Sequence, residues 1–228
     1  MPPIYNYREH FLKITVLFLI RKVNLIKTIS SDKSYSGQII DQLQLGGAQI
    51  RSSEFFDCIF NGCSFVESVF KECRFINCTF TNCDLSLVQL PGSTFSGTTF
   101  QDSKCIGINW ALAAWPEIGQ LGKPIRFKKC ALNHSTFIGL RLVGIQVLGC
   151  VAVDVDFRDS HLSQVDFSGT DLSESLFSNT NLSKADLSKA RNYRIDPINN
   201  EIKGAKFSLP EAMSLLYCMD IDLTDGET

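Results

Sequence analysis

The sequence places an apolar residue at every fifth position over most of its length. Thirteen consecutive positions from Leu45 to Cys105 are apolar, and thirteen more follow from Phe127 to Leu187. A small residue, often Ser, Thr, Cys or Ala, stands two places before most of them. Helices repeat near 3.6 residues and strands at 2.0, so neither explains a period of five. The pattern indicates a repeat protein.

The second run is offset from the first by two residues, which predicts an insertion or bulge between them. We place it near residues 106–124, where the segment Trp110–Pro124 contains both tryptophans. The chain then divides into an N-terminal appended segment (1–36), a repeat region (37–190) and a C-terminal cap (191–228). We expect one repeat domain with small additions at both ends.

Composition and motifs argue against several classes of protein. The formal net charge of −2 excludes a globally basic nucleic-acid binder, so no direct nucleic-acid binding is expected. No glycine-rich phosphate loop is present, and no catalytic grouping follows from the spacing of the histidines. We expect no enzyme, no cofactor and no catalytic residue. His134, Asp154 and Glu174 are twenty residues apart in series, which fits either a cation site or, more simply, a solvated ladder.

The segment TDLSESLFSNTNLSKADLSKA (Thr170–Ala190) resembles the A-(D/N)-L-x-x motif of the pentapeptide-repeat family. The resemblance extends over roughly residues 45–190. It implies an all-β solenoid, a right-handed quadrilateral β-helix with four pentapeptides per coil. The central apolar residue and the small residue two before it would point inward. Residues twenty apart would then form inward columns, namely Phe55/Phe75/Phe95, Phe60/Phe80/Phe100 and Phe137/Phe157/Phe177.

The cysteines follow the same pattern. Seven of the nine occupy the small inward position, and Cys105 occupies the central one. Free Cys behaves as a small buried hydrophobe, so core packing is the favoured role. Disulfides or a metal site between stacked pairs such as Cys58/Cys78 remain an alternative. So many unpaired thiols favour a cytoplasmic protein.

The ends of the solenoid need covers, because exposed strand edges invite association. At the C-terminus, Ser208, Pro210 and Glu211 form a capping-box pattern that opens a helix at about 209–219. Its apolar face includes Met213, Leu215, Leu216 and Met219. This helix would cap the last coil, and the resemblance implies that it also joins two chains in a homodimer.

The N-terminal segment contains the apolar stretch Phe11–Ile20, which is too short to span a membrane. We expect an appended helix that packs on the solenoid, or a stretch left over from an upstream start codon. Peripheral contact with a membrane is the alternative, because the segment is both basic and apolar.

Function must lie in the outward positions. Residues 150–187 contain two basic and seven acidic residues, the latter being Asp154, Asp156, Asp159, Asp166, Asp171, Glu174 and Asp186. Two coils span about 9 Å, over which duplex DNA carries about five charges. The local net charge of −5 (seven acidic less two basic) therefore resembles DNA over this stretch. An outward apolar stripe of Phe56, Ile59 and Ile76 is a second candidate surface, which either the N-terminal segment or a partner would cover.

Two hypotheses follow. The chain is similar to the quinolone-resistance and microcin-immunity pentapeptide proteins, which dimerise and present an acidic rod to DNA gyrase. That resemblance implies a non-enzymatic partial DNA mimic that binds gyrase or topoisomerase IV. The alternative is an interaction scaffold or secreted effector that contacts a protein or a membrane through its apolar stripe.

Overall fold

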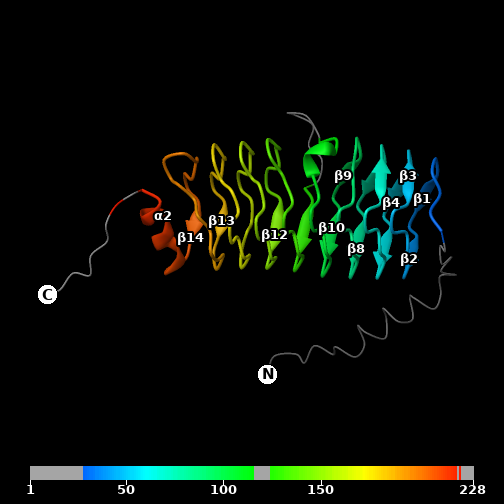
Figure 1. The fold of residues 1–228 in the computed structure, drawn as a ribbon, viewed down its shortest axis with the longest axis horizontal. Coiled ribbons are helices and arrows are strands. Elements are labelled where there is room, and N and C mark those ends of the chain that lie inside the picture. The colour runs from blue at the N-terminus through cyan, green and yellow to red at the C-terminus, as the bar shows by residue number, and fades with distance from the viewer. Residues whose placement is uncertain (1–27, 116–123, 220, 222–228) are drawn as a thin grey trace, which may run out of the picture.

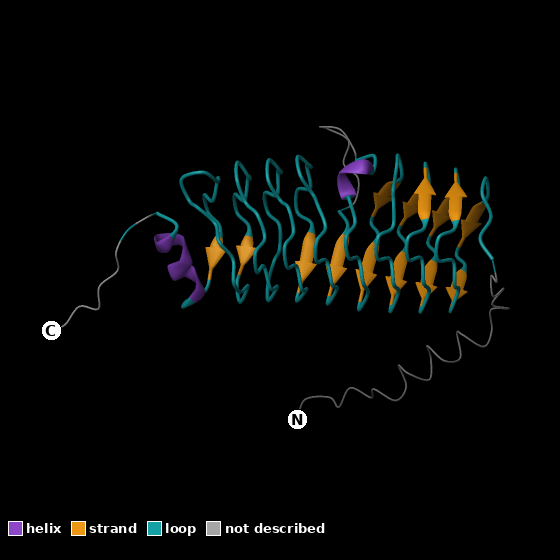
Figure 2. Ribbon diagram, viewed as in Figure 1, coloured by secondary structure: helices purple, strands orange, loops and turns teal. Residues whose placement is uncertain are grey.

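The chain forms an elongated rod, with a short helical segment at its C-terminal end (Figure 1). The computed structural model describes residues 28–115, 124–219 and 221. Its strands are two or three residues long and alternate with tight turns (Figure 2). They are β1 (Ser34–Ser36), β2 (Ile39–Asp41), β3 (Gln49–Arg51), β4 (Glu54–Phe56), β5 (Ile59–Asn61), β6 (Val69–Lys71), β7 (Arg74–Ile76), β8 (Thr79–Thr81), β9 (Thr94–Ser96), β10 (Thr99–Gln101), β11 (Arg126–Lys128), β12 (Gln146–Leu148), β13 (Asp186–Leu187) and β14 (Lys206–Phe207).

The strand pairing shows an all-parallel β-solenoid of about eight turns with four sides. Successive coils pair in register at a spacing of twenty residues, as in Phe55 with Phe75. The first side contains β1, β4, β7 and β9, the second contains β2, β5, β8, β10, β11 and β12, and the fourth contains β3 and β6. The third side is built from single bridges, such as Ser64 with Asp84. The expected fold is confirmed.

The interior is filled by columns of stacked rings. Phe55 and Phe75 lie 4.9 Å apart between ring centroids, with planes at 5°. The other predicted columns stack in the same way, with centroid distances between 4.3 and 5.4 Å. The column on the first side begins one coil earlier than predicted, because Tyr35 stacks on Phe55 at 5.1 Å.

The cysteines in the core are free thiols. Eight of them are buried, and Cys218 is half-buried. A buried thiol in the small inward position reaches the backbone of the previous coil, as where Cys78 donates to the carbonyl of Phe55 at 3.3 Å. Serine and threonine do the same at equivalent positions, as where Thr98 donates to Phe75 at 3.0 Å. The position accepts a compact side chain with a hydrogen-bond donor in many coils, and an aliphatic one such as Val88 or Val155 in others.

Most described corners of the rod have a residue with positive φ, two places after the inward residue; Leu112 is an exception. Side chains with a Cβ disfavour this conformation, and Gly, Asn and Asp tolerate it best. Twenty described non-glycine residues adopt it, and most are polar. Corner side chains also lie over the next coil: a Cβ on Gly107 would meet the side chain of Leu87 at 2.7 Å.

The insertion changes the register by seven residues. Phe100 pairs with Phe80 at a spacing of twenty residues, but with Phe127 at twenty-seven. The repeat continues through Trp110, which is fully buried and stacks on Phe137 at 5.7 Å. Trp110, which the sequence analysis placed in the insertion, is therefore a core residue. The 3₁₀ turn η1 (Trp110–Leu112) follows at this point.

The solenoid extends past both expected boundaries. At its start β1 pairs with β4, so Ser34–Ser36 belong to the first coil and not to an appended segment. At its end β13 pairs with β14, beyond residue 190. The predicted helix and membrane contact within residues 1–27 lie outside the described residues. Among the residues that the structure describes, no helix is long and apolar enough to cross a membrane.

A short helical segment closes the C-terminal end. It consists of the 3₁₀ turn η2 (Glu211–Met213) and the helix α2 (Ser214–Tyr217), shorter than the helix expected at 209–219. The predicted capping box does not form. Instead, the Ser208 hydroxyl accepts the amide of Lys189 at 3.2 Å, and the Glu211 carboxylate accepts that of Asn192 at 3.4 Å. In earlier coils the corresponding amides donate to a backbone carbonyl of the next coil. Here the side chains of Ser208 and Glu211 take the place of those carbonyls, because shielded amides require partners.

Candidate functional site: the acidic coils

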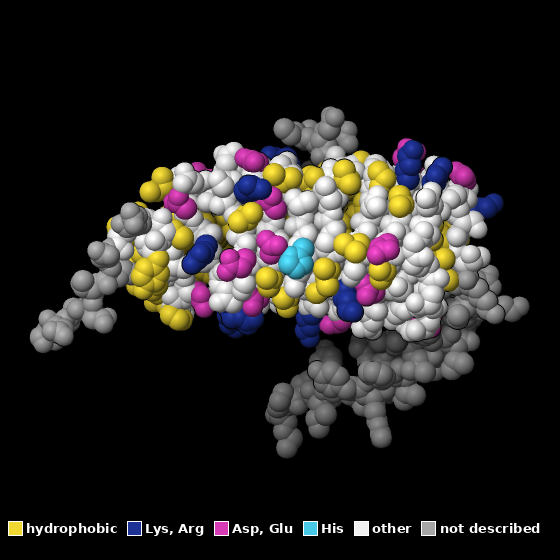
Figure 3. Space-filling view, viewed as in Figure 1, with side chains coloured by type: hydrophobic (Ala, Val, Ile, Leu, Met, Phe, Trp, Pro, Cys, Tyr) yellow, Lys and Arg dark blue, Asp and Glu magenta, His cyan; other side chains and the backbone are white. Residues whose placement is uncertain are grey.

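The seven acidic residues proposed as a partner surface lie outside the core, on three of the four sides. Asp166 and Asp186 lie on the second side, Asp154, Asp171 and Glu174 on the third, and Asp156 and Asp159 on the fourth. They form a band around the C-terminal half of the rod and not one stripe. Figure 3 shows acidic, basic and hydrophobic side chains interleaved on the visible face.

Four of these residues stabilise turns as well as carrying charge, since Asp156 accepts the amide of Arg158 at 3.0 Å. Asp166, Asp171 and Asp186 each accept the amide of the serine two places later. Ser173 donates its amide at 3.1 Å and its hydroxyl at 2.6 Å to the Asp171 carboxylate. The hydroxyl of Ser173, with further donors, lowers the pKa of Asp171 to about 2. These carboxylates are thus held in place by the repeat itself.

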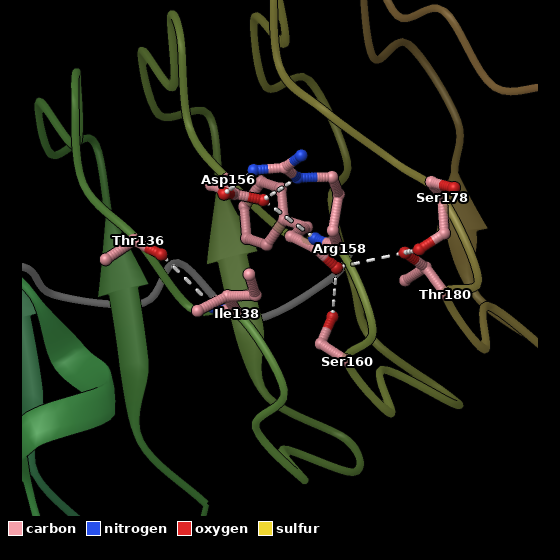
Figure 4. Close-up of polar contacts among 8 residues, drawn as sticks. Thr136, Ile138, Asp156, Arg158, Ser160, Ser178 and Thr180 are labelled. Carbon is pink, nitrogen blue, oxygen red and sulfur yellow. Dashed lines mark hydrogen bonds and ion pairs between the residues drawn. The ribbon is translucent and has the colours of Figure 1, made fainter.

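Ion pairs neutralise part of the band. Arg158 folds back on Asp156 through its Nε, at 3.0 Å, and its Nη2, at 2.8 Å (Figure 4). This guanidinium lowers the pKa of the Asp156 carboxyl. Further pairs are Asp171 with Arg191 at 3.5 Å, Asp186 with Lys206 at 3.2 Å, and Asp154 with His134 at 2.9 Å, the last only when His134 is protonated. The charge offered to a partner is therefore smaller than the residue count implies.

The other three carboxylates project from corners. Asp154, Asp159 and Glu174 have φ values of 55°, 60° and 56°. The Asp154 amide bonds the carbonyl of Ser173, which places Asp154 one coil from Glu174 on the same corner. All three residues are exposed. Because they support no serine turn, these corner carboxylates are the most accessible part of the band.

The apolar stripe is short. Phe56 and Ile76 are in register on β4 and β7, and both are half-buried. The flanking positions in this column are Ser36 and Ser96. Ile59, which is 42% exposed, lies on the second side of the rod. The structure therefore brings together two of the three predicted residues.

The ladder of His134, Asp154 and Glu174 does not form a recognisable metal site. His134 Nδ1 lies 2.9 Å from Asp154 Oδ2, and both side chains are more than half exposed. No group of three or more His, Cys, Asp or Glu side chains in the described part of the chain is arranged to hold a metal ion. The pair is a solvated surface contact.

Two family profiles match the sequence. A profile for the pentapeptide repeat region matches residues 53–119, and one for eight copies of the pentapeptide repeat matches residues 153–191. The described residues of both segments lie within the four-sided solenoid. The chain is a pentapeptide-repeat protein.

Solved structures share the fold of this pentapeptide-repeat protein. Two trypsin-treated variants of QnrB1, a plasmid-mediated fluoroquinolone resistance protein, superpose with TM-scores of 0.56 and 0.55. They are 19% and 20% identical, over 84% and 86% of this chain and 97% and 100% of theirs. Identity at this level establishes a common fold only. Comparison with curated proteins finds no significant match.

The end segment of this pentapeptide-repeat protein divides its predicted apolar residues between two roles. Leu215 packs against the core, and Leu216 is half-buried. Met213 and Met219 remain 36% and 40% exposed. The sequence analysis missed the neighbouring Tyr217, which is 65% exposed, because it considered only the apolar face of a longer helix.

Sequence reasoning also missed Leu87, which is 50% exposed at a corner with φ of 59°. Counting two places from the inward residue Leu85 would have identified it, because that position is otherwise polar or glycine in the neighbouring coils.

Proposed function

We propose that this pentapeptide-repeat protein is a non-enzymatic binding protein that occupies the DNA-binding surface of a type II topoisomerase, DNA gyrase or topoisomerase IV. In doing so it protects the enzyme from inhibitors such as quinolones. The observation that carries the proposal is the set of corner carboxylates, Asp154, Asp159 and Glu174, fixed on a rigid rod. The mimicry of DNA is local, because the charge is concentrated in the coils of residues 150–187.

The geometry supports this role in two ways. Coils stacked at the spacing of strands repeat every ~4.8 Å, so charges on one corner are held at fixed intervals. Because the backbone that carries these carboxylates is already ordered, little backbone freedom is lost on binding, which favours affinity. The shared fold with a fluoroquinolone resistance protein adds support from an independent direction.

The active form is a homodimer through the C-terminal segment. Met213, Tyr217 and Met219 leave apolar surface uncovered at the end of the rod. Such surface on a soluble protein commonly marks an interface. Two rods joined at this end would present two sets of corner carboxylates to one two-fold symmetric enzyme.

The scaffold alternative has less support. Its apolar stripe comprises only Phe56 and Ile76, both half-buried, with Ile59 on another side. A contact surface based on these residues would be small compared with stable protein interfaces.

Reversing the corner carboxylates tests the proposal. Substituting Lys for Asp154, Asp159 and Glu174 changes the local net charge from −5 to +1, by three changes of two units each. We expect the fold to survive, because these residues are exposed and support no serine turn. Binding to purified gyrase should collapse, and so should protection of supercoiling against a fluoroquinolone.

A matched control reverses three corner carboxylates outside the acidic coils, Asp57, Glu72 and Asp102, which have the same left-handed backbone. This control should retain most of the binding. Wild-type affinity should also fall as salt rises, because electrostatic attraction is screened. Full affinity after the reversal at Asp154, Asp159 and Glu174, at low and high salt alike, would refute the mimicry.

A further inference from the structure

Leu87 occupies a backbone position that its side chain does not favour. Among the twenty described non-glycine residues with positive φ, it is the one with a hydrocarbon side chain. Left-handed backbone is disfavoured for residues with a Cβ, and least so for Asn and Asp, whose side chains can bond locally. Burial does not explain its presence, because Leu87 is 50% exposed. Unfavourable conformations that persist on a surface often mark a functional site.

The neighbouring coil makes room for this side chain. Leu87 lies across Gly107, where a Cβ would meet Leu87 Cδ2 at 2.7 Å. Gly107 also has positive φ, so glycine there serves both the corner and the close approach. Val66 and Ile106 lie in the same column one place before the corner, and both are half-buried. Ser86 lies between them in that column, so Leu87 itself forms the exposed apolar knob of this corner.

The same corner is acidic on both sides of the knob. We call the corner that follows the third side of the rod the third corner, and backbone hydrogen bonds from coil to coil define it. In order along the rod it contains Gly47, Glu67, Leu87, Gly107, His134, Asp154 and Glu174. It contains no Lys or Arg over this length. Glu67 lies one coil from Leu87, and Asp154 three coils away on the other side, about 14 Å at strand spacing. Glu67 and Glu174 form no ion pair with any residue that the structure describes.

We propose that Leu87 is the apolar anchor of the partner-binding ridge formed by the third corner, and that it inserts into an apolar pocket bordered by basic residues on the partner protein. This inference rests on the proposed function and extends it to the specificity-determining residue. Apolar anchors in desolvated pockets provide most of the affinity of an interface, whereas surrounding charges mainly steer association. The acidic corner argues against an anionic membrane as the occupant, because like charges repel.

The proposal predicts an unusual combination of effects for Leu87→Asn. Asparagine tolerates the left-handed corner, so the melting temperature should stay equal to that of the unmodified protein or rise. Affinity for purified gyrase should nevertheless fall at least tenfold, because the anchor is lost. Leu87→Met, which keeps an apolar side chain, should bind within about twofold of the unmodified protein.

Leu112→Asn is the matched control, because Leu112 is 51% exposed on another corner and is absent from the positive-φ residues. It should leave affinity unchanged. Retained affinity in Leu87→Asn, or a loss accompanied by a clear fall in melting temperature, would overturn the anchor role. If the unmodified protein does not bind gyrase, the proposed function fails and this inference fails with it. Binding that survives Leu87→Asn overturns the anchor alone.

Discussion

At the scale of single residues, the place within the five-residue unit decides what a side chain does. An inward Phe is sealed between identical rings, whereas an outward Phe meets solvent. Phe157 and Phe56 show the contrast, since the first is fully buried and the second is half-buried. Carboxylates differ in the same way: Asp171 supports a turn, and Glu174 projects from a corner.

Phe157→Ala should destabilise the protein by about 3–5 kcal/mol, through lost burial and a residual cavity. Phe157 stacks on Phe137 at 5.4 Å and on Phe177 at 5.2 Å, so neither neighbour can collapse without losing its own contacts. Urea or thermal unfolding measures the effect. Phe56→Ala is the control and should lower the free energy of unfolding much less. Equal costs for the two variants would mean that the inward assignment is wrong.

Asp171→Asn should make stability less dependent on pH. The pKa of Asp171 is lowered from 3.8 to about 2 in the folded protein. A lowered pKa contributes stability that is present above the unfolded value and is lost as pH falls through the folded value. The advantage of the wild-type protein over the variant should therefore shrink between about pH 4 and pH 2. Unfolding midpoints of both proteins, measured over this pH range, test the prediction. A difference in stability that stays constant with pH would contradict it.

At the scale of elements, each strand is too short to be stable alone. The strands are two or three residues long, and each is held by the coils before and after it. Stability in such an array comes largely from contacts between neighbouring repeats, so the terminal coil needs a cover. Ser208 and Glu211 provide acceptors for that coil, and Leu215 covers its apolar end.

Separate variants should distinguish the two roles of the end segment. Leu215→Asp should lower the melting temperature, because it places a charge against the core. Met213→Asp combined with Met219→Asp should leave the melting temperature nearly unchanged and reduce the molar mass to that of a monomer. Sedimentation and thermal unfolding measure both effects. A paired Met variant that keeps the dimer mass would show that this surface is not the interface.

At the scale of the whole molecule, the rod converts a one-dimensional sequence pattern into surface columns. Residues twenty apart become neighbours on the surface until the insertion changes the step to twenty-seven. The third corner shows the consequence, because residues from Glu67 to Glu174 become one continuous ridge. A partner that lies along the rod axis therefore contacts the residues of one such column, which are far apart in sequence, and not a local sequence motif.

The five-residue period by itself determined which residues face the core, and the resemblance to the pentapeptide-repeat family implied the four-sided coil. Inward positions are set by local spacing, because each pentapeptide turns one corner whatever follows it. With four pentapeptides per coil, as the resemblance implies, Phe55, Phe75 and Phe95 were expected to stack, and they do. The burial of the eight cysteines in the repeats was the favoured prediction for the same reason, since the spacing places them inward.

Only the tertiary structure decided the register across the insertion, the ends and the state of the surface charges. Trp110 lies five residues after Cys105, so the period reaches it, but only its stacking on Phe137 in the next coil showed that the insertion begins after it. The side chains of Ser208 and Glu211 accept backbone amides of the last coil instead of capping a helix, because those unpaired amides need acceptors. The acidic residues were found from sequence, but their ion pairs and their distribution over three sides depend on contacts twenty residues apart and on the direction of each side chain.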